Sequence, residues 1–355
     1  MKAIKIVDTD KAELVTDATL TKDPCPDELL LKTVAVALNP TDWKHVGFGI
    51  PTRPTVGCDF AGVVEDVGPA VTRFKKGDRV WGMVHGSNQL RPDNAAFQEY
   101  LYAKEGVTVK IADDMSFEEA ASLGGMYQEM PIPWPNNPLR EKKQILIYGG
   151  SSATGALGIQ FAKLSGFEVL TTAGKNNFDY VKSLGADAVF DSRSLTVGEE
   201  IREYTKDKLC YVWDTIGEYG SDEASAKALA SKAPDGQKLY YGTILLKDIT
   251  DFVARRGTLE PRPDDVIQSM SLGYTAVGEA FEIKGTKFPA RPEDYEFAKK
   301  WMQFAGELIA QGKIKPHRVV SRYGGFESLV DGLEDLKNGV SGVKLVYQVA
   351  QVAEP

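Results

Sequence analysis

The sequence has few cysteines and no long hydrophobic segment. Its three cysteines, Cys25, Cys58 and Cys210, are far apart and form no CxxC pair, which argues against a disulfide framework and a structural zinc site. We expect them to be small buried apolar side chains. No segment is apolar over the length needed to span a bilayer, and the first fifteen residues have neither a long apolar core nor a small-residue cleavage site. The expected compartment is therefore cytoplasmic.

The chain also lacks long runs of one charge, internal repeats and low-complexity tracts. It has 50 acidic and 42 basic residues, a net charge of −8, which disfavours nucleic-acid and anionic-membrane partners and favours a small molecule. Hydrophobic residues make up 43% and charged residues 26%, as in ordinary globular proteins. A chain of 355 residues predicts two domains. Without heptads, monomer and dimer are both left as alternatives.

The first hundred residues contain short β-rich segments separated by glycine and proline. These segments are ELLLKTVAVAL, TVGCDFAGVVEDVG, GDRVWGMV and AFQEYLYA, and their composition predicts strands. Gly57, Gly62 and Gly68 interrupt the apolar pattern, as glycines do at bulges and barrel corners. The sequence therefore predicts an irregular β-barrel-like domain.

From Gln144 the pattern changes to alternating strands and helices. QILIY predicts a buried strand, ATGALGIQFAKLSG has apolar residues at helical spacing and ends at Gly166, and FEVLTTA predicts a second strand. Similar pairs continue as far as QKLYYGTIL. This alternation predicts a doubly wound parallel sheet with helices on both faces, so the fold class is α/β.

The C-terminal part predicts a long helix, PEDYEFAKKWMQFAGELIAQGKI, and then a strand, a helix and a final strand. The last strands have no obvious place in a parallel sheet, so we expect them to return to the first domain. The predicted divisions are 1–115 for the first domain, 116–285 for the second, and 286–355 for a C-terminal return that belongs partly to the first domain.

The segment GGSSATG, between the first strand and helix of the second domain, is close to a GxGxxG dinucleotide-binding loop. Gly150 and Gly155 stand at the first and third glycine positions, and Ser152 stands at the second. Gly149 and Gly150 allow a tight turn, and Gly155 allows the helix to pack closely on the sheet. The hydroxyls of Ser152 and its serine and threonine neighbours can donate to phosphate oxygens. We interpret the segment as a dinucleotide site, with a glycine-rich turn that binds nothing as the alternative.

Residues after the second strand favour NADPH over NADH. An NAD site usually has Asp or Glu about 20 residues beyond the loop, where it bonds the ribose 2′-hydroxyl. Here the segment TTAGKNN has no carboxylate and contains Lys175. A cation with neutral donors suits a 2′-phosphate. Arg193 is a second candidate for that phosphate, and for either cation a solvated surface residue is the alternative.

Together these motifs resemble the zinc-free medium-chain dehydrogenase/reductases. GCDFAGVVEDVG and FKKGDRVWG match GxDxAGxVxxVG and FxxGDRVxG of that superfamily, and YGGSSATG followed by NNFDYVKSLGAD is similar to the fungal trans-acting enoyl reductases of polyketide biosynthesis. The resemblance covers nearly the whole chain. It implies a GroES-like β-barrel domain, an inserted Rossmann NADP-binding domain and a cleft for NADPH. It also implies reduction of the α,β-double bond of a carrier-bound polyketide in secondary metabolism, with a polyketide synthase as possible partner.

The same resemblance assigns cofactor contacts by position. They are spread over both predicted domains. Near the nicotinamide ribose are Thr41, Asp42, Trp43 and Lys44; at the pyrophosphate Ser151, Ser152, Ala153 and Thr154; at the 2′-phosphate Gly174, Lys175, Asn176 and Asn177; and further contacts are Ser192, Ile244, Leu245, Val343 and Lys344.

Lys44 is the predicted catalytic residue. An ammonium near the thioester oxygen or the cofactor ribose offsets negative charge that develops during hydride transfer. A plain surface lysine is the alternative. No side chain is assigned as general acid, and water is the expected source of the proton.

Zinc is not expected. By the resemblance, zinc-dependent relatives have a cysteine where Asn39 stands and a histidine and a glutamate where Cys58 and Asp59 stand. A catalytic zinc needs three protein ligands, and the three histidines of this chain are scattered without an HxxxH pair. We therefore predict no metal site.

One segment departs from the family pattern. Between SFEEAASLGG and NNPLREKK the chain has only MYQEMPIPWP, where the family has a helix that links the domains and packs beneath the nicotinamide. Pro131, Pro133 and Pro135 disfavour a helix. Either a segment has been lost, or the join has been rebuilt as an extended connector. Loss would remove one wall of the nicotinamide pocket.

Three functions follow from this reading. The leading one is an NADPH-dependent, zinc-independent enoyl reductase acting on a carrier-bound polyketide. A quinone or small-enone oxidoreductase is an alternative with the same fold. An NADP-binding scaffold or sensor without turnover is the alternative of another class, because the family's helix between Gly125 and Pro131 is absent.

Overall fold

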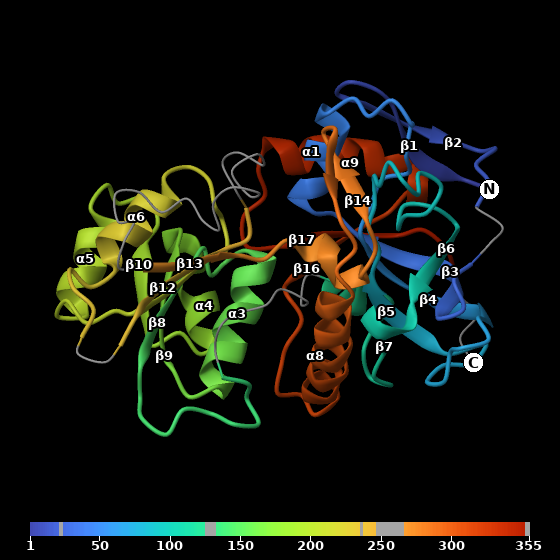
Figure 1. Cartoon of the computed structure of the whole chain (residues 1–355). Helices are drawn as coiled ribbons and strands as arrows, with labels where there is room; N and C mark the ends of the chain where they lie inside the picture. The colour runs from blue at the N-terminus through green and yellow to red at the C-terminus, as the bar shows by residue number, and fades with distance from the viewer. Residues whose placement is uncertain (21–23, 125–132, 235–236, 246–265, 352–355) are drawn as a thin grey trace. The chain divides into compact units, whose positions relative to one another are not determined.

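The structure, a computed structural model, describes residues 1–20, 24–124, 133–234, 237–245 and 266–351 (Figure 1). The chain divides into two compact units, Met1–Tyr127 with Tyr274–Pro355, and Gln128–Gly273. Among the described residues no helix is both long and apolar enough to cross a membrane.

These divisions lie about a dozen residues from the sequence-based boundaries at 115/116 and 285/286. At the first boundary, helix α2 (Phe117–Ala121) contacts β3 and β4 of the first unit. At the second, Ala276 and Val277 share a core cluster with Met83 and Val107. Both segments bury their apolar residues in the first unit. The sequence pattern of an apolar segment does not indicate which of two units it packs against.

The second unit is built on a six-stranded parallel sheet. Its strand order is β10-β9-β8-β11-β12-β13. From β8 the chain adds β9 and β10 on one side, and it then adds β11, β12 and β13 on the other side. The order of strand addition therefore reverses between β8 and β11, as in doubly wound nucleotide-binding folds. The bounds are β8 Gln144–Tyr148, β9 Glu168–Ala173, β10 Ala188–Asp191, β11 Tyr211–Asp214, β12 Leu239–Thr243 and β13 Val266–Met270.

Helices cover both faces of this sheet, which confirms the predicted α/β class. Ile145 and Ile147 of β8 pack in one cluster with Ile159 of α3. Leu146 packs in another cluster with Ile201 of α5, on the opposite face, because successive strand residues alternate in direction. The helices are α3 Ala153–Leu164, α4 Phe178–Ser183, α5 Val197–Tyr204 and α6 Ser221–Ala228, with the 3₁₀ turn η3 Lys175–Asn177. Strand β13 was not predicted.

The first unit is mainly antiparallel β-sheet. A seven-stranded sheet has the order β16-β17-β3-β4-β5-β7, and β6 also pairs with β3. The final strand β17 pairs antiparallel with β3, with Val346 opposite Ala37, so the end of the chain completes the sheet that its first part begins. The strands are β3 Glu28–Ala37, β4 Asp59–Val67, β5 Arg79–Met83, β6 Tyr100–Lys104, β7 Thr108–Lys110, β16 Val319–Arg322 and β17 Lys344–Gln348.

Smaller elements complete this unit. Strands β1 Ala3–Asp8 and β2 Lys11–Val15 pair with each other, as do β14 Phe281–Ile283 and β15 Thr286–Phe288.

The pairing of β3 with β4 shifts register near Thr33, which lies opposite Gly62. A side chain at Gly62 would meet the Lys32 carbonyl oxygen at 2.4 Å. The helical segments are α1 Pro40–Gly47, η1 Glu105–Val107, η4 Gly273–Val277, α8 Pro292–Ala310, η5 Gly325–Ser328 and α9 Leu329–Asn338.

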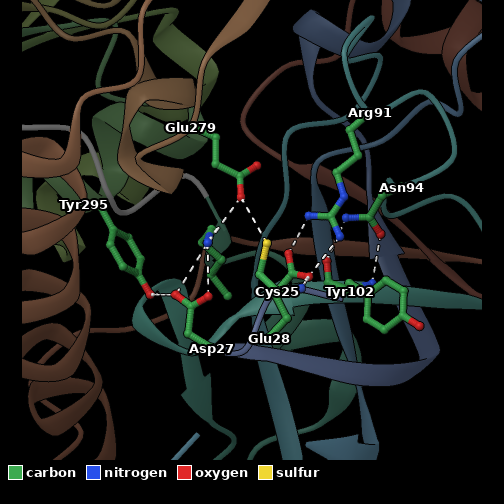
Figure 2. Close-up of polar contacts among 9 residues, drawn as sticks. Cys25, Asp27, Glu28, Arg91, Asn94, Tyr102, Glu279 and Tyr295 are labelled. Carbon is green, nitrogen blue, oxygen red and sulfur yellow. Dashed lines mark hydrogen bonds and ion pairs between the residues drawn. The ribbon is translucent and has the colours of Figure 1, made fainter. Parts of the chain in front are cut away.

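A network of charged and polar side chains, in which Glu28 is buried and the other charged residues are partly exposed, joins distant parts of the first unit (Figure 2). Glu28 is 1% exposed, and both of its carboxylate oxygens accept from the Arg91 guanidinium, one of them at 2.9 Å. Lys104 lies 3.2 Å from both Asp27 and Glu279. The Tyr295 hydroxyl on α8 donates to Asp27 at 3.0 Å. The network therefore ties the chain before β3 to the C-terminal segment.

We expect Arg91→Met to destabilise the protein by about 3 kcal/mol, because Glu28 would remain buried without its cation. Adding Glu28→Gln should recover part of this loss. Arg322→Met removes an exposed pair with Asp335 (3.4 Å) and should change stability by less than about 1 kcal/mol. Urea unfolding checks all three variants, and equal effects of Arg91→Met and Arg322→Met would contradict the account.

Candidate functional site

The loop after β8 requires glycine at three positions. Gly149 has a φ of 81°, and a side chain there would lie 2.5 Å from Ile216. At Gly150 a side chain would lie 2.0 Å from the Thr171 hydroxyl, and at Gly155 it would lie 2.3 Å from the Gly149 carbonyl oxygen. A tight turn and close packing of α3 on the sheet are thus both present, as a dinucleotide loop needs.

Ser152 has a different role from the one its sequence position suggests. Its hydroxyl oxygen caps α3 by accepting from the Gly155 N–H at 3.0 Å. It also bonds the Thr215 hydroxyl at 3.1 Å, and Thr215 in turn donates to the Tyr148 carbonyl at 2.7 Å. The Ser152 backbone N–H bonds Gly149. Ser152 thus shapes the loop through both of its polar groups, and its contact with phosphate stays a prediction.

Backbone N–H groups at the start of α3 are available as donors to an anion. Ala153 and Thr154 occupy the first two helical positions, where no intrahelical carbonyl is available as a partner. The positive end of the helix dipole lies at the same place. The residues of this loop therefore fit the pyrophosphate of a dinucleotide.

Several residues that support the loop have no motif of their own. The Thr172 hydroxyl accepts from the Gly149 N–H at 2.9 Å, and the Thr171 hydroxyl donates to the Ile147 carbonyl at 2.7 Å. Asp214, at the end of β11, accepts from two backbone N–H groups and from the Ser221 and Tyr241 hydroxyls. Burial raises the pKa of Asp214, and these donors oppose the rise. The sequence feature that could have pointed to Asp214 is a carboxylate at the end of the apolar strand β11.

The residues predicted for the 2′-phosphate follow β9. A side chain at Gly174 would meet nothing within 4 Å, so this position is open. Lys175 is 77% exposed and lies 3.6 Å from Asp191, a long surface pair that contributes little. Asn176 is exposed, whereas Asn177 is buried. The Ser192 N–H bonds the Ala173 carbonyl at 2.9 Å, which holds Ser192 beside the end of β9.

Ile244 and Leu245 lie directly after β12. The Leu245 carbonyl accepts from the Thr243 hydroxyl at 3.1 Å, and a side chain at Gly217 would lie 2.8 Å from Leu245. Because parallel strands end at one edge of a sheet, these residues share that edge with the loop after β8. Within the second unit, the structure thus brings the predicted contacts to one edge.

In the first unit, the predicted contacts Thr41 to Lys44 lie on α1, a helix that the sequence reading missed. The Asn39 N–H donates to the Asp42 carboxylate at 2.7 Å, and Pro40 is the first helical residue. Asp42 is 1% exposed, so its carboxylate stabilises the start of the helix rather than facing a ligand. Trp43 and Lys44 are partly exposed, and the Lys44 ammonium lies 5.7 Å from the Trp43 ring centre.

Lys344 lies at the start of β17 and is 4% exposed. Its ammonium donates to Asp59 at 3.0 Å and to the Asn39 side-chain oxygen. Val343 beside it is partly exposed. Asn39 and Asp59 stand at two of the positions that the family resemblance assigns to zinc ligands. Because a lysine ammonium already bonds both, these residues do not fit a zinc ion at that place.

One other group of possible metal ligands lies together in the described part of the chain, namely Cys25, Glu28 and Glu279. Its carboxylates are paired with Arg91 and Lys104, so a second cation there would be repelled. The expectation that the cysteines are buried is confirmed for Cys58 and Cys210, whereas Cys25 is only partly buried.

Two of the scattered histidines meet around Tyr274. The ring of His85 stacks on Tyr274 with centres 3.9 Å apart and an angle of 7° between the planes, and the ring of His45 lies 5.7 Å away. Burial lowers the pKa of His45 to about 4 and that of His85 well below its usual value. Both are therefore neutral at pH 7. His317 lies elsewhere, and burial lowers its pKa to about 3.

Comparison with known proteins defines the class. The model of the alcohol dehydrogenase GroES-like domain matches residues 25–113, and that of the zinc-binding dehydrogenase family matches residues 153–261. An alcohol dehydrogenase superfamily protein from Novosphingobium aromaticivorans has a similar structure, with a TM-score of 0.75, 20% identity, and coverage of 99% of this chain and 100% of that one. The fold is that of the medium-chain dehydrogenase/reductases, which are nucleotide-dependent oxidoreductases.

Curated relatives define the family. A trans-enoyl reductase of Alternaria alternata is 40% identical over 333 residues, covering 90% of this chain and 91% of its own length. One of Aspergillus sclerotiorum is 39% identical over 350 residues, covering 90% and 92%. The chain therefore belongs to the trans-enoyl reductases, a family of oxidoreductases that act on C=C bonds. The resemblance predicted from the sequence motifs is confirmed.

We expect Ser152→Ala to lower stability by about 1 kcal/mol, because α3 would lose its N-terminal cap. Ser151→Ala, a change at the neighbouring serine, should leave stability within a few tenths of that of the wild type. Urea unfolding measures both. A phosphate-binding role for the Ser152 hydroxyl would instead leave the stability of the unliganded protein unchanged.

The stability of the protein should depend on pH through Asp42. Burial raises its pKa from 3.8 to about 7. The folded state therefore holds a proton that the unfolded chain releases above about pH 4, so this contribution is fully present below pH 4 and is lost as pH rises through 7. Asp42→Asn keeps an acceptor for Asn39 and cannot ionise. Its melting temperature minus that of the wild type should increase from pH 4 to about pH 8; a constant difference would contradict the assignment.

Proposed function

We propose that this chain is an NADPH-dependent, zinc-independent trans-acting enoyl reductase that reduces the α,β-double bond of a carrier-bound polyketide intermediate. The proposal is supported by the glycine-rich loop after β8 in a member of the trans-enoyl reductase family, which has three sterically required glycines and backbone donors at the start of α3. A polyketide synthase is the proposed partner, because the relatives are named trans-enoyl reductases. The proposed compartment is the cytosol.

NADPH is the proposed cofactor because the segment after β9 suits a phosphate. Residues 171–177 contain no carboxylate, position 174 is open, and Lys175 extends into solvent. Asn176, next to Lys175 in sequence, is one neutral donor. Ser192, which bonds the end of β9 through its N–H, is another. The Lys175 ammonium lies 3.6 Å from the Asp191 carboxylate, and this long, exposed pair is readily exchanged for a phosphate.

Once bound, NADPH supplies a hydride to the β-carbon of the unsaturated thioester. Negative charge then develops on the thioester oxygen, and we assign its stabilisation to the partly exposed Lys44 on α1. Lys344 is not available for that role, since Asp59 and Asn39 bond its ammonium inside the unit. We propose that it holds the start of α1 in place, where zinc-dependent relatives have a metal.

The alternatives remain a quinone or small-enone oxidoreductase and an NADP-binding protein without turnover. The second depends on the segment between Gly125 and Pro131, and residues 125–132 lie outside the described part of the chain. Residues 133–143, which are described, contain turns and no helix, as Pro133 and Pro135 predict.

Absorbance of NADPH during incubation with crotonyl and longer enoyl thioesters, and separately with quinones, tests the proposal. Faster oxidation with the thioesters is expected. Faster oxidation with quinones would favour the first alternative, and saturable NADPH binding without oxidation by any acceptor would favour the second.

We expect Lys175→Ala to weaken NADPH binding about tenfold, because a charge-assisted bond to the 2′-phosphate would be lost. Affinity for NADH, which lacks that phosphate, should be unchanged. Lys232→Ala, at an exposed lysine of the same unit, is the matched control. Fluorescence titration measures both affinities, and an equal loss for the two cofactors would refute the role of Lys175.

A further inference from the structure

Tyr274 places a phenolic hydroxyl next to α1. It lies in η4 and is 8% exposed. Its Oη shares a hydrogen bond with the Oγ1 of Thr41, a partly exposed residue in the first turn of α1. Thr41 is one of the residues proposed to contact the nicotinamide ribose. The phenol therefore lies one hydrogen bond from the proposed reaction site, although 233 residues separate it from Thr41 in sequence.

Aromatic contacts hold the ring of Tyr274 in place. His85 stacks on it with 3.9 Å between the ring centres, and Phe281 meets it edge-on with centres 5.9 Å apart. The ring centre of His45, which lies on α1, is 5.7 Å from the ring centre of Tyr274. A ring fixed by several contacts presents its hydroxyl in one direction, which suits a group that has to deliver a proton to a particular atom.

Enoyl reduction needs such a proton. After hydride transfer to the β-carbon, the α-carbon must gain a proton to complete the saturated thioester, and sequence analysis found no side chain for this step. A phenol is a far stronger acid than an alcohol such as the Thr41 hydroxyl, and it carries a proton that it can donate. The two nearby histidines are neutral at pH 7 and are poor acids in that form.

We propose that Tyr274 donates the proton to the α-carbon. This inference rests on the proposed function. The Oη–H bond breaks as the α-carbon–hydrogen bond forms, and the electron pair of the enolate becomes the new C–H bond. The resulting phenolate takes a proton from the Thr41 hydroxyl, which regains one from water because Thr41 is partly exposed. Each turnover thus consumes one proton from solvent and leaves Tyr274 and Thr41 unchanged.

Tyr274→Phe is the direct test, since it removes the hydroxyl and keeps the ring that His85 and Phe281 contact. With an enoyl thioester as acceptor, kcat should fall about 100-fold, while the Kd for NADPH measured by fluorescence should stay within about twofold. In D2O the wild type should place deuterium on one face of the α-carbon, and the variant should place it on both faces, because water then protonates the enolate. Tyr295→Phe, which removes a phenolic hydroxyl bonded to Asp27 in the same unit, should leave kcat and stereochemistry unchanged.

A second measurement is independent of turnover. Melting temperatures of Thr41→Val, Tyr274→Phe and the double variant form a cycle, and the double variant should lose less than the sum of the single losses because the two hydroxyls bond each other. Additive losses would overturn the proton route. A Tyr274→Phe enzyme with wild-type kcat and single-face deuteration would overturn the inference alone, whereas a wild-type protein that reduces no enoyl thioester would overturn the proposed function and the proton donor with it.

Discussion

The buried pair between Lys344 and Asp59 is the interaction on which the first unit depends. It joins β17, near the end of the chain, to β4, and the same ammonium bonds Asn39, the residue that begins α1. A buried ion pair compensates for its loss of hydration only when further hydrogen bonds complete it. The position of α1, which carries Thr41 and Lys44, therefore depends on a strand formed some three hundred residues later.

The second unit uses its side chains in a comparable way. The hydroxyls of Ser152, Thr172 and Thr215 bond the protein and hold the loop after β8. The groups left for a ligand are backbone N–H donors at the start of α3 and the flexible cation of Lys175. The polar side chains Ser152, Thr172 and Thr215 thus maintain the backbone geometry of the loop, which is the part that we propose to bind phosphate. A serine at the middle glycine position is compatible with this function because its side chain becomes the helix cap.

Local patterns were sufficient to predict the parallel sheet, since Ile145 to Tyr148 are buried on both faces and the helices between strands have regular apolar spacing. They also identified the glycine turn and the lack of a carboxylate after β9. They failed for α1, because a capping box formed by Asn39 and Asp42 begins a helix within a region otherwise rich in strands. Local patterns also carry no information on the unit to which α2 and η4 belong, because their apolar side chains are assigned by tertiary packing, here in the first unit.

The sequence by itself determined the α/β class and the family, because strand and helix periodicity and glycine spacing are local properties. Only the tertiary structure decided which polar groups are used within the protein and which remain for a ligand. Ser152, Asp42 and Lys344, which are predicted by position to contact the cofactor, are each hydrogen-bonded within the protein. Tyr274 had no motif, and it became a candidate only through its contact with Thr41 and His85. Such contacts join residues far apart in the chain, and no local pattern encodes them.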